Sequence, residues 1–434
     1  MEENNLLEIL VKWNFWDQKA TLGFPREITK NIINYLKGPE IISLKGVRCS
    51  GKSTILFQII DTLLSQGVEP KDILFINFEE PLFFQRKESI ILDRLYAIYR
   101  ERVNPGRFAY VFLDEVQEIP GWEKWVRVKT DLKEAKVFVT GSSSRLLTAE
   151  FGTLLTGRHI SFTVYPLSFK EFLRFKGLKE TSDPVSIIGE KALIKNLLHE
   201  YMQFGGFPEV VLKDRHDFKD KLLKQYFEDI VYRDIVSRYK VRDIATLKNI
   251  ALFYMTNISS LSAYNRIKNT LNVPLEVARK YSGFLAESFL VREVMKHSFK
   301  VREQLRNPKK VYAIDTGMRN AVSYRFSQDM GRIAENIVFL TLLQQEKEVY
   351  YFKERGEVDF LVRKGMAPES LIQVCMADEN SKAWERELQS LEDALQAVGL
   401  KRGLLITENR EEIIPVKSGE IRAVPFWKWL LEID

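Results

Sequence analysis

The stretch LKGVRCSGKSTILFQII (residues 44–60) places a short run of mostly small and basic residues between two apolar runs. The β-branched residues before it are typical of a buried parallel strand, and the residues after it keep helical spacing. Between them, Gly46 and Gly51 bracket four residues and are followed by Lys52 and Ser53. The pattern G-x-x-x-x-G-K-S in a strand-loop-helix context predicts a phosphate-binding loop, or P-loop.

A loop of this kind holds a polyphosphate mainly through its backbone. Its glycines let N–H groups face inward, and the helix N-terminus adds partial positive charge. We expect Lys52 to reach the β- and γ-phosphates and Ser53 to offer its hydroxyl to Mg²⁺. The expected nucleotide-binding residues are Gly46, Val47, Arg48, Cys49, Ser50, Gly51, Lys52, Ser53 and Thr54. The alternative is an ordinary glycine-rich turn, but the context favours a nucleoside triphosphate, with ATP and Mg²⁺ as the expected cofactors.

A second motif supplies acidic residues. The apolar run at 110–113 predicts a strand, and Asp114 and Glu115 stand at its carboxyl end, where open α/β sheets bind ligands. We expect Asp114 to hold Mg²⁺ together with Ser53, and Glu115 to polarise the attacking water. Acid pairs also occur at strand ends by chance, but this one follows Lys52 by 62 residues (114 − 52), which strengthens the assignment.

Hydroxyl groups follow the next predicted strand, AKVFVTG, which ends near Thr140 and precedes Ser142, Ser143 and Ser144. A hydroxyl at this edge of the sheet can sense the γ-phosphate by hydrogen-bonding the attacking water. Thr140 and Ser142 are the candidates for this role. The alternative is that these residues cap the following helix.

Two arginines are candidates for the same site. Arg158, in LLTGRHISF, follows a tight turn and is expected to stabilise charge on a γ-phosphate, in its own subunit or a neighbour's. The alternative for Arg158 is a surface arginine that closes a helix. Arg26, in a predicted helix before the P-loop, is expected to be a solvated helix charge, with a place near the nucleotide as the alternative.

Composition limits the class of protein. With 434 residues, of which 45% are hydrophobic, the chain can form two or three domains. Cys49 and Cys375 stand far apart, without a CxxC or Cys/His cluster, so neither disulfides nor a zinc site is expected. A reducing cytoplasm is the expected compartment. The N-terminus lacks the basic start of a signal peptide, and no apolar run approaches 18 residues, so we expect a soluble protein without membrane contact.

The positive charge is concentrated in one region. From Arg238 to Lys310 there are 15 Lys and Arg against 5 Asp and Glu, a balance of 15 − 5 = +10. Because the whole chain carries +6, the remainder carries 6 − 10 = −4. This distribution predicts a module that binds a polyanion within an otherwise acidic protein.

Several ordered motifs resemble one known family. They are GVRCSGKST, VFLDEVQEIPGWEKWVRVKTDL, VFVTGSSSRLLTAEFGTLLTGRHISFTVYPLSFKEFL, GGFPEVV, YFEDIVYRDIV, VYAIDTGMRNAV and GRIAENIVF. Together they resemble archaeal and bacterial AAA+-type ATPases that join an AAA domain to a C-terminal region of poorly understood role. The resemblance covers nearly the whole chain. It implies ATP hydrolysis, a helical lid, and possible assembly as a ring or dimer in which Arg158 acts between subunits.

Four regions are therefore expected. Helices alternate with short apolar strands in the first, which predicts a parallel sheet. The fold class is an α/β P-loop NTPase with an AAA+-like parallel sheet, a helical lid, a winged-helix module and a C-terminal α/β nuclease-like domain. The expected boundaries are 1–165 for the core, 166–243 for the lid, 244–312 for the winged helix and 313–434 for the last domain.

The basic region has the pattern of a helix-turn-helix. A predicted helix ends near Leu271, NVP turns the chain, and a second helix begins at Pro274. The core is expected to contain Ile267, Leu271, Val277, Tyr281, Phe284 and Leu285. Arg279 and Lys280 would face a DNA groove, and the residues expected on phosphates are Lys296, Lys300 and Arg302. Helix-turn-helix folds also serve as protein-binding scaffolds, which is the alternative.

The C-terminal region resembles the restriction-endonuclease-like fold, in which a helix Glu, a strand Asp and a Glu-x-Lys strand hold a metal. Glu335 and Asp359 match the first two positions, but Gln373 replaces the ligand Glu and Cys375 replaces the Lys. Gln is a weak ligand for a hard cation, and Cys cannot replace an ammonium. We therefore expect a degenerate site that docks or binds DNA without cleaving it, and a core position for Cys375.

The preferred hypothesis is a Mg²⁺-dependent ATPase that couples nucleotide turnover to DNA binding or remodelling. One alternative is a nucleotide-dependent switch that controls assembly with a protein partner. Another is an ATP-gated nuclease.

Overall fold

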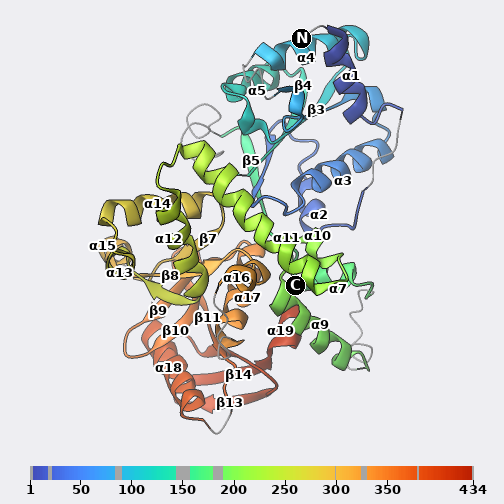
Figure 1. The fold of residues 1–434 in the computed structure, drawn as a ribbon. Coiled ribbons are helices and arrows are strands. Elements are labelled where there is room, and N and C mark those ends of the chain that lie inside the picture. The colour runs from blue at the N-terminus through green and yellow to red at the C-terminus, as the bar shows by residue number, and fades with distance from the viewer. Residues whose placement is uncertain are drawn as a thin grey trace. The chain divides into compact units, whose positions relative to one another are not determined.

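The computed structural model describes residues 3–17, 22–83, 90–142, 157–178, 189–298, 300–323, 330–378 and 381–432. The chain forms two compact units that meet in sequence between Val164 and Tyr165 (Figure 1). Within the described ranges, no helix combines the length and the apolar character that a membrane crossing requires.

The first unit is built on a five-stranded sheet whose neighbouring strands are all parallel. Its strands are β1 (Ile41–Gly46), β2 (Ile73–Asn77), β3 (Ala109–Asp114), β4 (Ala135–Gly141) and β5 (His159–Val164). Their order across the sheet is β2-β3-β4-β1-β5. Because β1 lies between β4 and β5, the sequence order reverses beside it. A crevice at the carboxyl end of β1 is therefore the expected ligand site of such a sheet.

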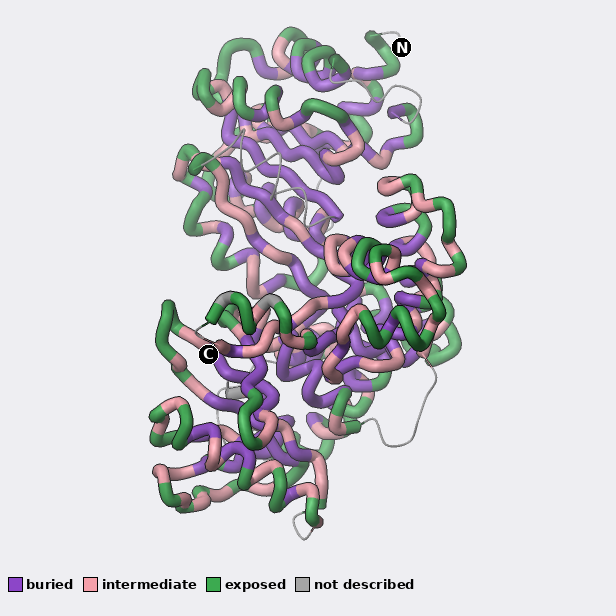
Figure 2. Tube along the Cα trace, turned by 90° about the vertical axis from the view of Figure 1, so that its left-hand side faces the viewer, coloured by how far each residue is buried: buried purple, intermediate pink, exposed green. Residues whose placement is uncertain are grey.

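Helices cover both faces of this sheet. They are α1 (Glu3–Trp13), α2 (Glu27–Ile33), α3 (Lys52–Ser65), α4 (Ile90–Arg102) and α5 (Trp122–Asp131). One hydrophobic core joins α1, α4 and α5 to the sheet, and a second core joins α2 and α3. The strands are consequently apolar on both sides, which explains their nearly continuous hydrophobic sequences. Figure 2 shows these strands as the buried centre of the unit.

The second unit begins with helices. They are α7 (Phe169–Phe175), α9 (Lys191–Phe204), α10 (Pro208–Val211), α11 (His216–Asp229) and α12 (Ile244–Thr256), with a π-helical segment at Ile230–Ser237. Helix α7 begins with a capping box, because Ser168 accepts from the Glu171 N–H while the Glu171 carboxylate accepts from the Ser168 N–H. This local arrangement fixes the start of α7.

Three short strands and three helices follow. They are β6 (Ser260–Ser262), α13 (Tyr264–Leu271), α14 (Leu275–Glu287), β7 (Val291–Val294), α15 (Val301–Arg306) and β8 (Lys309–Ala313). The strands form an antiparallel sheet in the order β6-β8-β7. Between α13 and α14, Asn272 adopts a left-handed conformation and Pro274 caps the second helix, as the NVP turn predicts. The connection from β7 to β8 carries helix α15, which the sequence did not indicate.

The remaining chain forms a mixed six-stranded sheet with helices. Its elements are α16 (Thr316–Val322), α17 (Met330–Gln344), β9 (Glu348–Lys353), β10 (Glu357–Lys364), β11 (Ala367–Cys375), α18 (Lys382–Val398), β12 (Arg402–Thr407), β13 (Glu412–Val416), β14 (Gly419–Pro425) and α19 (Phe426–Glu432). The strand order is β13-β14-β12-β11-β10-β9. Strands β9, β10 and β11 are antiparallel neighbours, whereas β11, β12 and β14 run parallel.

Two of the quoted motifs, GGFPEVV and VYAIDTGMRNAV, pack against each other. The Gly206 N–H donates to Asp315 Oδ2 at 2.7 Å, and the Met318 N–H donates to Oδ1 at 2.8 Å. Gly205 has a φ of 72°, and a Cβ there would lie 2.1 Å from the Asp315 carboxylate. These motifs therefore form a structural joint inside the second unit, with α16 packed against α9 and α11.

Candidate functional site

The P-loop joins β1 to α3 at the carboxyl edge of the first sheet, as the sequence predicts. Gly46 is required there, since a Cβ would lie 2.1 Å from the Val164 carbonyl oxygen of the neighbouring strand β5. Cys49 is exposed and has a φ of 64°, a left-handed conformation that turns the loop backbone. The strand, loop and helix thus supply the backbone arrangement that a phosphate cradle needs.

Lys52 is buried at the first turn of α3, with 4% of its surface exposed. Its Nζ donates to the carbonyl oxygens of Gly46 at 3.2 Å and Val47 at 3.3 Å, and lies 3.2 Å from Glu115 Oε1. The ammonium is therefore held over the loop by one carboxylate and two neutral carbonyls.

Asp114 lies between two hydroxyl groups at the end of β3. Ser53 Oγ donates to its Oδ2 at 2.7 Å, and Thr140 Oγ1 donates to its Oδ1 at 2.5 Å. Burial raises the pKa of the Asp114 carboxyl to about 6, and the adjacent Glu115 charge acts in the same direction. Ser53 and Asp114 present oxygen atoms side by side, a donor set that suits a hard cation such as Mg²⁺.

Glu115 has a φ of 52°, which turns its carboxylate towards Lys52. Gln117 Nε2 donates to Glu115 Oε2 at 2.5 Å. Burial alone would raise the pKa of Glu115, but the charges of Lys52 and Arg48 outweigh it and lower that pKa to about 2. Glu115 is therefore ionised at neutral pH and can accept a hydrogen bond from a water molecule.

Thr140 connects the two acids. Its Oγ1 donates to the Asp114 carboxylate and accepts from the backbone N–H of Glu115 at 2.9 Å, so it holds the side chain of one acid and the backbone of the other. Ser142 is fully buried just after β4, which lies beside β1 in the sheet. Ser143 and Ser144 lie outside the described residues.

Arg26 differs from the sequence-based expectation of a solvated helix charge. It is 5% exposed, and its Nη1 donates to the Ser50 carbonyl oxygen in the P-loop at 2.7 Å. Arg48, inside the loop, pairs with Glu79 at 2.7 Å. The expectation for Arg26 is wrong because the segment before α2 folds back on the loop, a long-range contact that helical spacing does not encode.

Arg158 lies at the opposite edge of the sheet from the P-loop. Strands β1 and β5 are parallel and pair Ile41 with His159 and Gly46 with Val164, so Arg158 precedes the first pair. At about 3.3 Å per residue, the five steps from Ile41 to Gly46 span roughly 16 Å. Arg158 instead pairs with Asp131. It therefore does not lie at its own P-loop, which leaves two alternatives for it, a surface arginine or an arginine that acts between subunits.

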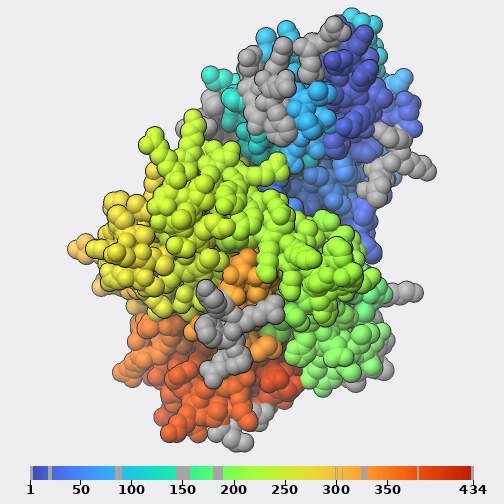
Figure 3. All heavy atoms as spheres, in the orientation of Figure 1, coloured from blue at the N-terminus to red at the C-terminus, as the bar shows by residue number. Residues whose placement is uncertain are grey.

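Helix α14 carries Arg279 and Lys280, two of the residues expected to contact DNA; α13, α14 and α15 are part of the yellow surface in Figure 3. Arg279 and Lys280 are exposed on α14. Arg279 lies 3.8 Å from the Glu276 carboxylate, and Lys280 lies over the Phe284 ring. Of the expected core, Ile267, Tyr281, Phe284 and Leu285 are buried, while Leu271 and Val277 are half-buried.

The three other expected phosphate contacts lie between β7 and β8. Lys296 is half-buried, and its backbone bridges to Tyr351. Lys300 is the N-cap of α15, and Arg302 lies exposed within that helix. Only part of the basic charge in this region is therefore available at the surface of α14 and α15.

The C-terminal acids converge, as the sequence suggests. Glu335 on α17 and Asp359 on β10 both contact the ammonium of Lys310, a residue that the sequence analysis counted only as basic charge. Gln373 accepts from the Asp359 N–H at 3.0 Å and donates to Glu387 at 2.6 Å. Among the described residues, no group of His, Cys, Asp and Glu is placed to hold a metal.

Burial and the Asp359 charge raise the pKa of Glu335 to about 8, although Lys310 and Tyr312 act in the opposite direction. Lys310 itself is buried, but the charges of Asp359, Glu335 and Glu357 outweigh burial and raise its pKa well above the ordinary value. Cys375 is 3% exposed within a hydrophobic cluster, and burial raises the pKa of its thiol.

Comparisons with known proteins agree with this geometry. A family model described as "AAA domain" matches residues 38–173, and one described as "Domain of unknown function (DUF8612)" matches residues 195–329. The uncharacterized protein MJ1544 of Methanocaldococcus jannaschii is 35% identical over 402 residues, which cover 89% of this chain and 87% of MJ1544. The chain belongs to the MJ1544 family.

A second relative is a bacterial protein. An uncharacterized protein of Haemophilus influenzae is 33% identical over 327 residues, 74% of this chain and 79% of the relative. Among solved structures, the Aeropyrum pernix Orc1 protein in complex with DNA is 13% identical, with a TM-score of 0.31. That alignment covers 68% of this chain and 90% of Orc1, but a likeness this weak carries no argument about function.

For this member of the MJ1544 family, the AAA match and the five-stranded parallel sheet confirm the predicted α/β P-loop NTPase fold. Both halves of the site, the P-loop and the acids at the end of β3, fall within the matched residues.

Proposed function

We propose that the protein is a Mg²⁺-dependent ATPase. The observation that carries this proposal is the set of contacts around the P-loop, in which Ser53 and Thr140 hold Asp114 while Lys52 holds Glu115. A structural turn would not require a buried lysine and two buried carboxylates at one edge of a sheet, since buried charges are costly unless paired.

Each residue then has a separate task. Backbone N–H groups of the loop and the Lys52 ammonium bind the phosphates, and Ser53 and Asp114 hold the metal ion. Mg²⁺, when bound, supplies positive charge at the β- and γ-phosphates. Glu115 orients the attacking water through its ionised carboxylate, and Thr140 keeps the Asp114 side chain and the Glu115 backbone in place.

The first experiment measures ATP affinity and phosphate release for the full chain with Mg²⁺. Lys52→Ala should strongly weaken ATP binding, because it removes the ammonium expected to reach the β- and γ-phosphates. Lys37→Ala removes an exposed lysine from the same unit and should bind ATP like the wild type. Unchanged ATP affinity in Lys52→Ala would contradict the proposed phosphate cradle.

We also propose that DNA is the polyanion that the protein binds, and that residues 166–243, 244–312 and 313–434 act as lid, winged helix-turn-helix and nuclease-like fold. The order of α12, β6, α13, α14, β7 and β8 supports the second module, as does the order of α17, β9, β10, β11, α18 and β12 for the third. The exposed Arg279 and Lys280 on α14 supply the positive surface.

DNA binding is tested with single-stranded, duplex and junction DNA. Reversing the charge of Arg279 and Lys280 should weaken DNA binding, and the loss should depend on the salt concentration. The matched control reverses Lys221 and Lys224, which are exposed on α11. If the two double variants bind DNA with equal affinity, α14 is not part of the DNA interface. Tight retention of nucleotide without any response of turnover to DNA would favour a protein-binding switch instead.

A further inference from the structure

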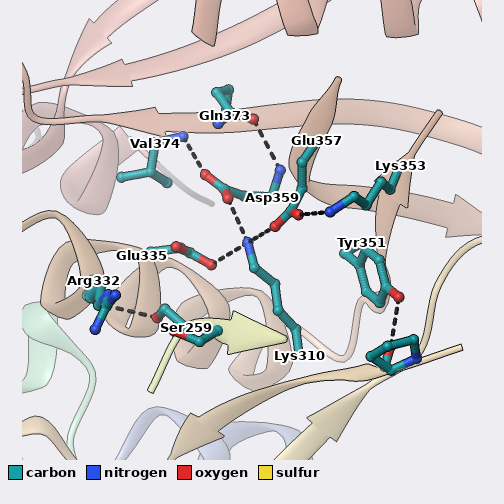
Figure 4. A network of polar contacts seen from close by, with 12 residues as sticks. Ser259, Lys310, Arg332, Glu335, Tyr351, Lys353, Glu357, Asp359, Gln373 and Val374 are labelled. Atoms are coloured by element: carbon teal, nitrogen blue, oxygen red, sulfur yellow. Dashed lines mark hydrogen bonds and ion pairs between the residues drawn. The ribbon is translucent and has the colours of Figure 1, made fainter. Parts of the chain in front are cut away.

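Three carboxylates surround one buried ammonium in the C-terminal part of the chain. Lys310 Nζ, from β8, lies 2.7 Å from Asp359 Oδ1, 2.8 Å from Glu335 Oε1 and 3.1 Å from Glu357 Oε1 (Figure 4). Glu335 comes from α17, whereas Glu357 and Asp359 lie on the same face of β10. The ammonium therefore sits where the acids of two elements converge.

The surroundings satisfy this cation completely. Lys310 is 2% exposed, so its charge has almost no contact with solvent. An ammonium has three N–H donors and no acceptor, and the three carboxylates provide one acceptor for each donor. Because removing a charge from water costs several kcal/mol, such a position is stable only with partners of this kind.

Two of the oxygen atoms that do not contact Lys310 also have partners. Asp359 Oδ2 accepts from the Val374 N–H at 3.0 Å, and Glu357 Oε2 pairs with Lys353 at 3.0 Å. Glu335 Oε1 also accepts from Tyr312 Oη at 2.7 Å. A divalent cation such as Mg²⁺ needs about six oxygen ligands at about 2.1 Å, so it cannot use these atoms while the ammonium remains.

Lys310 also comes from a different sheet. Strand β8 pairs with β6 and β7, whereas β10 belongs to the six-stranded sheet. The two sheets are further joined by the bridge between Lys296 and Tyr351, and Tyr351 Oη donates to the Pro308 carbonyl oxygen at 2.6 Å. The ammonium thus ties the three-stranded sheet to α17 and β10.

We propose that the Lys310 ammonium is the resident cation of the Glu335, Glu357 and Asp359 centre and excludes a divalent metal ion from it. The centre fastens two sheets and cleaves no phosphodiester bond. Removing the ammonium while keeping the acids converts it into a site for a divalent cation. This inference is independent of ATP hydrolysis, because none of its residues belongs to the first unit.

The first test measures Mn²⁺ binding by electron paramagnetic resonance, using the full chain without nucleotide. An Asp114→Asn background removes the carboxylate of the P-loop site, so that bound Mn²⁺ reports other sites. Adding Asp359→Asn should leave Mn²⁺ binding unchanged at millimolar concentrations, since Lys310 already fills the centre. A Mn²⁺ site that disappears with Asp359→Asn would overturn the proposal, and so would plasmid nicking that depends on Asp359.

The second test uses Lys310→Ala in the same background. This variant should gain one Mn²⁺ site that Asp359→Asn abolishes, and Mn²⁺ should raise its Tm but not that of the parent. The matched control is Lys353→Ala, which removes a half-exposed ammonium from the same Glu357 and should gain no site. A folded Lys310→Ala chain that binds no additional Mn²⁺ would overturn the proposal. If Lys310→Ala does not fold, the first test decides.

Discussion

The P-loop site and the Lys310 centre each hold a buried lysine beside buried acids, but the groups that contact the two lysines differ. Lys52 contacts one carboxylate and two backbone carbonyl oxygens on a loop, whereas Lys310 contacts three carboxylates from a helix and a strand. Neutral carbonyls hold an ammonium less strongly than carboxylates do. The first arrangement leaves the lysine able to exchange partners for a ligand, and the second fixes it.

The comparison predicts a large difference in stability. Lys310→Met should lower the free energy of unfolding by about 4 kcal/mol, because it leaves buried acids without a cation. Lys52→Met should lower it less, since Glu115 keeps the Gln117 hydrogen bond and the charge of Arg48. Urea unfolding, monitored by circular dichroism, measures the free energy of unfolding of both variants. Equal losses would remove the proposed distinction between the two lysines.

The largest effect on turnover should come from Glu115→Gln. An amide does not carry the charge that orients water, so phosphate release should fall about 10²-fold or more. ATP affinity should remain, because the P-loop and Lys52 are unchanged. Thr130→Val, which removes a half-buried hydroxyl bonded only within α5, serves as a control for general disturbance. Turnover within a factor of two of wild type would contradict the role of Glu115.

A smaller effect, on ATP affinity, is expected from Arg26, which contacts the P-loop backbone. Arg26→Met removes the hydrogen bond to the Ser50 carbonyl and should weaken ATP binding about tenfold, near 1.4 kcal/mol. Arg158→Met should leave ATP affinity unchanged, because Arg158 lies at the other edge of the sheet. Isothermal titration calorimetry measures the ATP affinity of both variants. The reverse order of effects would show that the P-loop geometry is misassigned.

A separate prediction concerns how stability changes with pH. Folding raises the pKa of Glu335 from 4.5 to about 8, so the folded chain binds a proton that the unfolded chain releases. The stabilisation from that proton is complete below about pH 4.5 and is lost as pH rises towards 8. Wild-type stability should therefore fall relative to Glu335→Gln over this range. A constant difference at pH 5, 6.5 and 8 would contradict the raised pKa.

The sequence predicted the P-loop and the acid pair because each motif is contiguous and its strand fixes its direction. It placed the end of α13 at Leu271 and the start of α14 next to Pro274 correctly for the same reason. These features depend on local spacing, which a single sequence displays directly.

The features that the sequence did not reveal depend on distant contacts. Arg26 reaches a loop residue 24 positions away, and Lys310 reaches Asp359 across 49 positions. The sequence counts Lys310 among the basic charges that would bind a polyanion. Burial among acids instead removes it from any such interface. The sequence of β8 does contain one indication that Lys310 points inward. Lys310 and Tyr312 are separated by one residue, Val311, and therefore lie on the same face of the strand.

The most direct test of the account is release of orthophosphate from ATP and Mg²⁺ by the purified full chain, measured beside Glu115→Gln and with bound nucleotide quantified in both. The account predicts that both proteins bind ATP and that only the wild type releases phosphate at an appreciable rate. A folded wild-type chain that neither binds ATP nor releases phosphate would contradict it.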